Sequence, residues 1–496
     1  MKNTESYSPT MLPSKGDLFI GGQWCAPVEG GYKEAINPAN GEVIMSVADG
    51  SAKDVDAAVL AATAAWQKWS VIPPLERAQA LKRAANIIRA NADDLIMLDV
   101  IDGGNPVSEL KFDVMASAAL FDFFAGLVTE MKGHSIPMGP NAVNFSVREP
   151  YGVVGRITAF NHPFLFAAAK SAAPLAAGNT VILKPAEQTP LSAIKLAELL
   201  KDEFPPGTLS VVTGGIPAGR ALSHHPGVMA IGLVGSINAG RAVMEGAAQT
   251  IKHVVLELGG KNALIASADA DPEDVADAMI RGMNFGWCGQ SCGSTSRAFL
   301  HRDIAQAVLH RVKEKVANIH PGLPSDPATK MGSLVSQEHL KRVLAYIESG
   351  IEEGAQLLHG GTRPDDPALA NGCFLEPTIF TGVKPEMKIA SEEIFGPVLS
   401  VIEWDDEEIM LQAVNGVPYG LTCAIWTQSV TDAHRLAGRV QAGYVWINEV
   451  SKHFIGVPFG GYKQSGLGRE EGLEELLSFT QEKNIHINLA PSNSSE

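Results

Sequence analysis

One cysteine stands where a nucleophile would stand. Cys292 ends the stretch Gly289-Gln290-Ser291-Cys292, which follows a helical pattern and is bracketed by glycines. A cysteine in such a turn has an accessible sulfur, and the backbone N–H groups around it can lower its pKa and stabilise an oxyanion. The alternative is a buried cysteine that packs as a small apolar residue, and this motif by itself favours the alternative.

Two polar residues follow predicted strands. Glu257, in ELGGK, ends an apolar run where parallel sheets build their sites, so it can act as a general base. Its alternative is a glutamate that faces solvent or pairs with Lys261. Asn161, in FNHP, can donate its amide to an oxyanion, and its alternative is a cap for the helix that Pro163 begins.

Two further turns contain groups that can bind a nucleotide. Lys184 and Glu187 follow a predicted parallel strand and can hold ribose hydroxyls. The turn GSINAG at 235–240 leads from a strand into a helix, whose N–H groups can receive a pyrophosphate. It is not a Walker A loop, because Arg241 replaces the required Lys-Ser/Thr pair, and it lacks the G-x-G-x-x-G pattern.

Alternating strands and helices position these turns. Apolar runs between residues 151 and 260 alternate with helical patterns, which predicts a parallel sheet with helices on both faces and ligands at the carboxyl ends of its strands. A second α/β unit follows from about 261 to 460. The helical patterns of the two units lie near 163–177, 189–203, 217–224, 238–249, 271–284, 303–318 and 337–354.

The segments before and after these units, and the segment 132–150, have different patterns of apolar and turn residues. Residues 18–46 indicate short strands, and helical patterns follow at 55–69 and 74–102. The segment 132–150 is rich in turn residues and alternates at its end, so we expect a hairpin that leaves the main body. Residues 470–488 indicate a short helix and a closing strand.

Composition restricts the class of protein. The 496 residues carry a net charge of −16 and give a pI of about 5.3, which argues against a nucleic-acid partner. Five cysteines are too few for a disulfide scaffold and suit a reducing, cytoplasmic compartment. The polar first 16 residues contain no secretory signal, and the longest apolar stretch is broken by Lys170, so we expect no membrane span. No metal site is predicted.

Taken together, the motifs resemble those of the aldehyde dehydrogenase superfamily, of the NAD(P)-dependent, hydrolytic (non-acylating) type. Similarity extends over nearly the whole chain, from FIGGQW at 19–24 to GGYKQSGLGRE at 460–470. Eight motifs in one order make an accidental match implausible. They are FNHP, LKPAEQTP, GSINAG, ELGGK, GQSC, EEIFGPV at 392–398, PYGL at 418–421 and PFGGYKQSG at 458–466.

The resemblance implies an α/β fold in three parts: a Rossmann-like parallel-sheet cofactor domain, a second α/β catalytic domain and a small β oligomerisation element. It also implies a homodimer or homotetramer built by pairing of the hairpin edge. The expected bounds are 18–131 and 151–258 for the NAD-binding domain, 259–458 for the catalytic domain, 132–150 and 471–490 for the oligomerisation element, and 1–17 and 491–496 for loose tails.

The resemblance also implies a mechanism. The Cys292 thiolate attacks an aldehyde carbonyl, and the Asn161 amide and the Cys292 N–H hold the oxyanion of the thiohemiacetal. Collapse of that oxyanion sends hydride to a nicotinamide and leaves a thioester. Glu257 then deprotonates the water that hydrolyses the thioester to a carboxylic acid. Lys170, on the helix after Asn161, tunes the base or orients the cofactor.

The implied cofactor is NAD, with NADP as the alternative. A carboxylate at Glu187 accepts from a ribose 2′-hydroxyl and repels a 2′-phosphate, which favours NAD. Glu393 would hold the nicotinamide ribose, with Phe395 packing nearby. The full set of implied cofactor positions is Phe160, Lys184, Glu187, Gly235, Ser236, Gly240, Leu258, Glu393 and Phe395.

Three departures from the family pattern bear on the substrate: Phe160 replaces a common Trp, His162 a common Phe, and Trp287 a common Asn. The expected tunnel liners favour an aromatic or medium-length apolar aldehyde; they are Phe160, His162, Phe164, Phe166 and Phe454.

Several alternatives remain open. Lys452 and His453 would suit the distal carboxylate of a semialdehyde, and an aminoaldehyde would follow the same mechanism. A CoA-acylating enzyme would not need Glu257, and a cofactor-free thiol hydrolase would want a histidine near the cysteine. Cys288, four residues before Cys292, either packs or traps it in a reversible disulfide.

Overall fold

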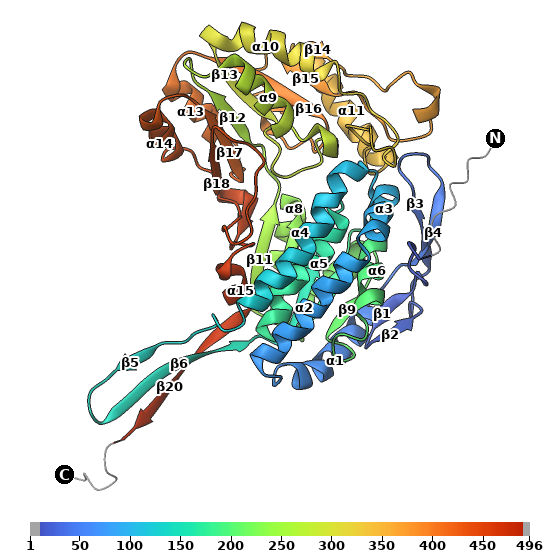
Figure 1. Ribbon diagram of the computed structural model, residues 1–496, viewed down its shortest axis with the longest axis vertical. Coiled ribbons are helices and arrows are strands. Elements are labelled where there is room, and N and C mark those ends of the chain that lie inside the picture. The colour runs from blue at the N-terminus through green and yellow to red at the C-terminus, as the bar shows by residue number, and fades with distance from the viewer. Residues whose placement is uncertain (1–9, 490–496) are drawn as a thin grey trace.

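The computed structural model describes residues 10–489 (Figure 1). Its largest sheet is the central layer of the first α/β unit. The sheet order is β19-β11-β10-β7-β8-β9-β1-β2, and the five strands from β11 to β9 are parallel. The strands are β1 Leu18–Ile20, β2 Gln23–Cys25, β7 Val153–Ile157, β8 Thr180–Lys184, β9 Leu209–Val211, β10 Ala230–Gly235, β11 His253–Leu258 and β19 Gly466–Leu467. Chain order runs outward from β7 to β9 and then jumps to β10 on the other side of β7. This reversal is the point at which open α/β sheets bind ligands.

Helices cover both faces of this sheet. On one face α1, α7 and α8 share a core with the strands, and on the other face α5 and α6 pack beneath an outer layer of α2, α3 and α4 (Figure 1). Their bounds are α1 Ala52–Trp69, α2 Pro74–Ala90, α3 Ala92–Gly103, α4 Val107–Gly126, α5 Pro163–Ala177, α6 Leu191–Leu200, α7 Ile216–His224 and α8 Ile237–Ala248.

The second α/β unit has its own sheet and core. Its strand order is β14-β15-β16-β13-β12-β17-β18, parallel except for the edge strand β14. The strands are β12 Ala263–Ala266, β13 Arg297–His301, β14 Gln356–His359, β15 Thr378–Thr381, β16 Val398–Trp404, β17 Thr422–Trp426 and β18 Tyr444–Ile447. The helices are α9 Pro272–Gly282, α10 Arg302–Val316, α11 Gln337–Glu352, α12 Lys388–Ser391, α13 Glu407–Asn415 and α14 Val430–Ala437, with 3₁₀ turns η1 Phe285–Trp287, η2 Pro367–Leu369 and η3 Lys463–Ser465.

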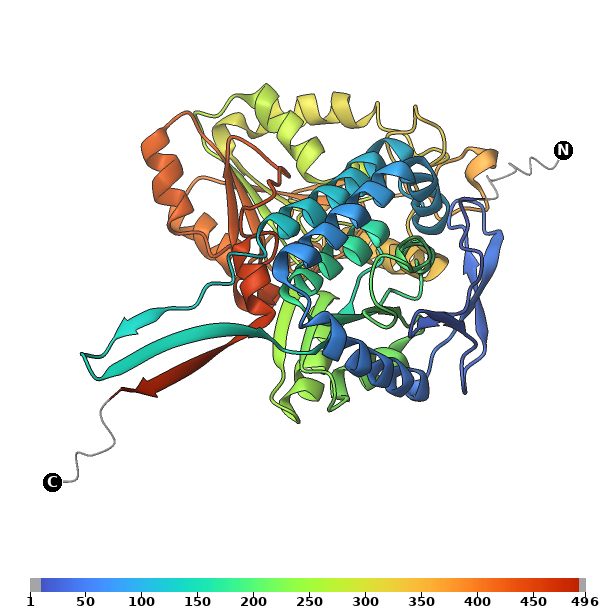
Figure 2. The ribbon, with the colours of Figure 1, turned by 60° about the horizontal axis from the view of Figure 1, so that its bottom comes forward.

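A three-stranded sheet extends away from both units (Figure 2). It contains β5 Ser135–Pro137, β6 Ala142–Pro150 and β20 Thr480–Asn488, and β20 follows the short helix α15 Leu473–Ser478. Strand β20 pairs antiparallel with β6 along its whole length, whereas its other edge has no strand partner among residues 10–489. A smaller two-stranded sheet joins β3 Tyr32–Ile36 to β4 Val43–Ala48.

Local sequence explains the helix that follows the first strand of the unit. Pro163 stands at the first position of α5, where its missing N–H costs nothing. The helix ends at Gly178, whose φ of +97° lies in the left-handed region that glycine adopts without strain. The turn 158–162 therefore lies between the carboxyl end of β7 and the first residue of α5.

The α/β fold class predicted from the sequence is confirmed by these two parallel sheets. Helix α4 was not predicted, because Phe112 and Met115 are exposed on it and blur the amphipathic pattern of its buried face. The stretch 74–102 divides into α2 and α3 at Asn91. Within the expected tail 1–17, Met11 is buried and Ser14 donates to Glu198, so that part is packed; residues 1–9 and 490–496 lie outside the described chain.

Candidate active site

The predicted polar residues gather at one edge of the first sheet. Lys184 ends β8 and Gly235 ends β10, while Glu257 is the next-to-last residue of β11. Strand β10 pairs with β11 so that Val234 lies beside Glu257, and Asn161 follows β7 in the same direction. Because these strands are parallel, their carboxyl ends share one edge. The structure therefore brings these groups to the switch point of the sheet.

The Cys292 loop packs against the segment that follows Glu257. The Asn262 side chain donates from Nδ2 to the Cys292 carbonyl oxygen at 2.6 Å and to the Ser294 carbonyl oxygen at 3.0 Å. A Cβ added to Gly260 would lie 2.5 Å from that Cys292 oxygen, so only glycine permits the approach. Cys292 itself is half-buried.

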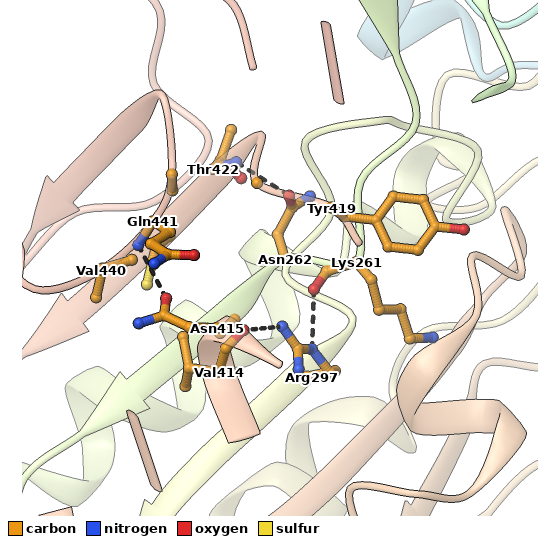
Figure 3. Close-up of a pocket in the computed structure, with 13 residues that line it drawn as sticks. Lys261, Asn262, Arg297, Val414, Asn415, Tyr419, Thr422, Val440 and Gln441 are labelled. Carbon is orange, nitrogen blue, oxygen red and sulfur yellow. Dashed lines mark hydrogen bonds between the residues drawn. The ribbon is translucent and has the colours of Figure 1, made fainter. Parts of the chain in front are cut away.

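Asn262 was not among the residues singled out from the sequence, although it anchors the nucleophile loop. Its Oδ1 accepts the Thr422 N–H at 3.0 Å, which ties it to β17 (Figure 3). The neighbouring Arg297 donates to the Lys261 carbonyl oxygen at 2.8 Å and so fixes the same segment from below. Its position directly after ELGGK was the available signal.

The turn that contains Asn161 contacts the Cys292 loop from the other side. His162 and Trp287 have ring centroids 4.2 Å apart, and the Asn105 side chain donates to the Asn161 carbonyl oxygen at 3.0 Å. The capping alternative for Asn161 is wrong: His162 is the cap residue of α5, and the Asp99 carboxylate accepts the Phe164 N–H. Within residues 10–489 the Asn161 side-chain amide has no recorded hydrogen bond.

Glu257 is a buried carboxylate whose pKa is raised. Burial raises the pKa of Glu257 to about 8, although the positive charge of Lys170 opposes the shift. Its Oε1 has no hydrogen-bond partner among the described residues. Neither alternative from the sequence fits, because Glu257 does not face solvent and has no ion pair with Lys261 in the described chain. A carboxyl with a pKa near neutrality is suited to proton transfer.

A buried ionic cluster lies behind Glu257. Lys170 Nζ lies 2.7 Å from Glu470 Oε2, and Arg156 Nη2 lies 2.8 Å from Glu470 Oε1. Burial opposes the charge of Glu470, but Lys170 and Arg156 outweigh burial and lower its pKa. Lys170 therefore binds Glu470 and acts on Glu257 only through its charge. The sequence signal for Arg156 was a charged residue inside an apolar strand, which must be paired when buried.

The pKa of Cys292 moves opposite to the expectation from its turn. Burial raises the pKa of the thiol well above its usual value, and the negative charges of Glu257 and Glu393 raise it further. The expected lowering by backbone N–H groups was wrong, because burial of the thiol dominates and the carboxylates of other segments add to its effect. The thiol must pass its proton to a base before it can attack.

The strand ends at this edge of the first sheet, from the turn after β8 to the segment after β11, are called the crevice below, and the predicted ribose-binding pair lies at its outer end, after β8. Lys184 is buried, its Nζ donates to the Pro185 carbonyl oxygen at 2.8 Å, and burial lowers its pKa to about 8. Glu187 is 43% exposed and lies 3.4 Å from Lys33 Nζ. Lys33, which also contacts Asp49 at 3.1 Å, was not predicted, because it belongs to a distant strand.

The predicted pyrophosphate turn has the geometry of a helix N-terminus. Ser236 caps α8, and its Oγ accepts the Ala239 N–H at 3.2 Å. Gly240 lets α8 contact β11, because a Cβ there would lie 2.5 Å from Leu258 Cδ1. The first N–H groups of this 12-residue helix thus point toward the crevice edge. Gly235 and Ser236 therefore lie in the turn before α8, and Gly240 packs against Leu258 beneath it.

Glu393, Phe395 and Phe160 come together at the inner end. Glu393 Oε1 accepts the Gly260 N–H at 2.9 Å, and burial raises its pKa to about 7. Phe395 has a φ of +59°, and its ring lies edge-on to Phe160 at 5.5 Å. These contacts place Glu393 beside the Cys292 segment.

One expected tunnel liner, Phe164, and the cysteine that precedes the nucleophile, Cys288, are both buried. Phe164 is fully buried in the core shared with α4, so the expectation that it lines the substrate tunnel was wrong. Cys288 is buried with a φ of +52°, and its Sγ donates to the Gly332 carbonyl oxygen at 3.0 Å. Phe454 is exposed.

Neither a metal site nor a membrane span was found in the described part of the chain. Residues 10–489 contain no group of three or more His, Cys, Asp or Glu side chains that could hold a metal ion. No helix among them has the length and apolar character needed to cross a bilayer.

Fold and site together define a class of α/β enzyme in which a cysteine lies beside a dinucleotide-type crevice. The model of the aldehyde dehydrogenase family matches residues 24–485. The aldehyde dehydrogenase tropH of Talaromyces stipitatus is 47% identical over 486 residues, covering 96% of this chain and 94% of that one. This chain belongs to the aldehyde dehydrogenase family and is an NAD(P)-dependent aldehyde dehydrogenase.

Solved structures agree with this assignment. A putative aldehyde dehydrogenase from Burkholderia cenocepacia is 39% identical, with a TM-score of 0.94 over 98% of this chain and 100% of that one. An aldehyde dehydrogenase from Bacillus cereus, solved as its NAD⁺ complex, is 37% identical, with a TM-score of 0.93 over 97% of this chain and 98% of that one.

Proposed function

We propose that this enzyme oxidises an aldehyde to the free carboxylic acid with NAD⁺, through a covalent intermediate on Cys292. The observation that supports this proposal most strongly is the packing of Cys292 against the Gly260–Asn262 segment, next to the buried carboxylate of Glu257. A nucleophile and a base then share one enclosed space.

The crevice fits a dinucleotide. Gly235, Ser236 and the N-terminus of α8 offer N–H groups for a pyrophosphate, and Lys184 and Glu187 lie where an adenine ribose would bind. Glu393 would hold the second ribose. When bound, NAD⁺ supplies the hydride acceptor. The NAD⁺ complex of the Bacillus cereus relative supports NAD as the cofactor.

The first half of the reaction forms a bond between Cys292 Sγ and the carbonyl carbon. Because the thiol pKa is raised, its proton must leave, and the Glu257 carboxylate is placed to accept it. The Asn161 amide and the Cys292 N–H would then donate to the oxyanion. Loss of hydride from the same carbon leaves a thioester on Cys292.

The second half releases the acid. After the proton taken from Cys292 has passed to solvent, Glu257 removes a proton from water and the water oxygen attacks the thioester carbon. The C–S bond then breaks, and the departing Cys292 thiolate takes up a proton to regenerate the thiol. Burial raises the pKa of Glu257, the Lys170 charge behind it opposes the rise, and the Glu470 charge adds to it. A CoA-acylating enzyme would not require this carboxylate, and product analysis for free acid against acyl-CoA separates the two.

The assembly and location of the enzyme complete the proposal. The edge of β20 that pairs with no other strand of residues 10–489 supports a homodimer or homotetramer, and a monomer in light scattering would contradict this. The five cysteines are all free thiols, which supports the cytoplasmic placement.

The test combines a substrate panel with the Cys292→Ala variant. Benzaldehyde, hexanal, succinic semialdehyde and an aminoaldehyde are offered with NAD⁺ and NADP⁺, and NADH formation and free acid are measured. Cys292→Ala should retain NAD⁺ binding and lose turnover by at least about a thousandfold. Cys25→Ala, in a half-buried position on β2, is the matched control and should be fully active. Turnover by Cys292→Ala would refute the covalent mechanism.

A further inference from the structure

A histidine–carboxylate pair lies beside the proposed oxyanion site and has no role in the mechanism above. His162 directly follows Asn161, and its Nδ1 lies 2.8 Å from Asp113 Oδ2. Asp113 projects from α4 and is only 2% exposed, whereas the His162 side chain is 17% exposed. The carboxylate thus fixes the ring from the protein side and leaves its other side accessible.

Aromatic contacts hold the ring in one orientation. Its centroid lies 4.2 Å from that of Trp287, in the loop that leads to Cys292, and 5.4 Å from that of Phe166 on α5. The imidazole therefore lies between the Asn161 turn and the nucleophile loop. A phenylalanine would satisfy both aromatic contacts but would leave the Asp113 carboxylate unpaired.

The hydrogen bond to Asp113 determines what the free nitrogen can do. In the neutral ring, Nδ1–H donates to the carboxylate, so Nε2 carries the lone pair and acts as an acceptor. Nε2 has no recorded partner among residues 10–489, and it is not among the fully buried polar atoms. This nitrogen can accept a hydrogen bond from a hydroxyl group on a ligand.

A second acceptor lies near the same wall. Glu109, in the first turn of α4, has its Oε1 3.0 Å from the point that a Cβ on Gly286 would occupy. Burial and the charge of Asp113 raise the pKa of Glu109, and its carboxyl has no recorded ion pair within the described residues. Both acceptors contact the loop that leads to Cys292, so they suit a substrate that carries a hydrogen-bond donor. Glu109 would repel a carboxylate on the substrate.

We propose that His162, held by Asp113, selects aldehydes that carry a hydroxyl group, and hydroxylated aromatic aldehydes in particular. This inference rests on the proposed function and names the substrate class of the same site. Trp287 and Phe166 pack against the His162 ring, so the surroundings of the imidazole are aromatic and suit an aromatic ring with a hydroxyl better than an ammonium group. His162 is the specificity-determining residue, and Asp113 is the positioning residue behind it.

The experiment compares kcat/KM for 3-hydroxybenzaldehyde and 4-hydroxybenzaldehyde with that for benzaldehyde, in the wild type and in His162→Phe. The wild type should prefer at least one hydroxylated aldehyde by about tenfold, the order of one well-placed hydrogen bond. His162→Phe keeps the ring contacts and should lose that preference, so the ratio of its kcat/KM for the hydroxylated aldehyde to that for benzaldehyde should fall to about one. Asp113→Asn should reduce the preference with little change in kcat for benzaldehyde, which a purely structural role of Asp113 would not do.

Two outcomes would overturn the inference: an unchanged preference in His162→Phe, or a wild type that prefers the aminoaldehyde or succinic semialdehyde to both hydroxylated aldehydes. Failure of the proposed function would look different, because the wild type would then oxidise no aldehyde to free acid. Thermal unfolding of both variants, measured beside the wild type, identifies a loss that comes from misfolding.

Discussion

The two ends of the crevice use charge in opposite ways. At the outer end, Lys33 and Glu187 are about half exposed, and their ion pair lies open to solvent. At the inner end, Lys170, Glu470 and Glu257 are almost completely buried. Solvent and salt screen the outer pair, so it contributes little energy, whereas the inner charges interact strongly and shift pKa values. Exposed charge therefore suits a graded choice between cofactors, and buried charge suits proton transfer.

The largest effect at the inner end is expected for Glu257→Gln. Glutamine keeps the size of the side chain but cannot accept a proton, so thioester hydrolysis should slow by about 10² to 10⁴. Because Glu257 also accepts the Cys292 proton, NADH should form more slowly than in the wild type and then stall at one equivalent per active site, which stopped-flow absorbance measures. Steady turnover at the wild-type rate would contradict the role of Glu257 as the base.

The same residue predicts the pH dependence. Because the pKa of Glu257 is raised to about 8 and the base must be deprotonated, the hydrolytic rate should rise with pH up to about that value. In Glu257→Gln this limb should disappear from the pH profile of the residual rate. A limb that persists in the variant would assign it to another group.

Disruption of the ionic cluster behind Glu257 should lower the stability of the protein more than disruption of an exposed ion pair does. Glu470→Ala leaves Lys170 and Arg156 buried without their partner, which costs about 3–5 kcal/mol for a pair of this kind. The expected result is a marked drop in the thermal unfolding midpoint. Lys53→Ala breaks the exposed Lys53–Glu29 pair and is the control, with an expected cost below about 1 kcal/mol. Equal drops for both variants would refute the distinction between buried and exposed charge.

Sequence predicted those parts of the site that local patterns determine. The ends of apolar runs located Glu257, Asn161 and Lys184, because a parallel sheet brings all its strand ends to one edge. Helix α5 was also predictable, since a proline begins it and a glycine ends it. These signals lie within a few residues of the group they position.

Contacts between distant segments could not be predicted in this way. Arg156 and Glu470 are 314 residues apart in the chain, and His162 and Asp113 are 49 apart. The direction of the Cys292 pKa shift was missed for the same reason, because other segments bury the thiol and bring Glu257 and Glu393 near it. Charge balance in a buried site depends on the whole fold rather than on the turn that carries the nucleophile.

The smallest effect is expected at the outer end, for Lys33→Ala. Removal of the Lys33 cation leaves the Glu187 carboxylate uncompensated, so it should repel a 2′-phosphate more strongly while it still accepts from a 2′-hydroxyl. The ratio of kcat/KM for NAD⁺ to that for NADP⁺ should rise about two- to fivefold, as for an exposed pair, and the rise should shrink at high salt. KM for the aldehyde should not change, because Lys33 pairs with residues of the outer end only, and Lys53→Ala again serves as the control. A fall in the ratio would mean that Glu187 does not face the 2′ position.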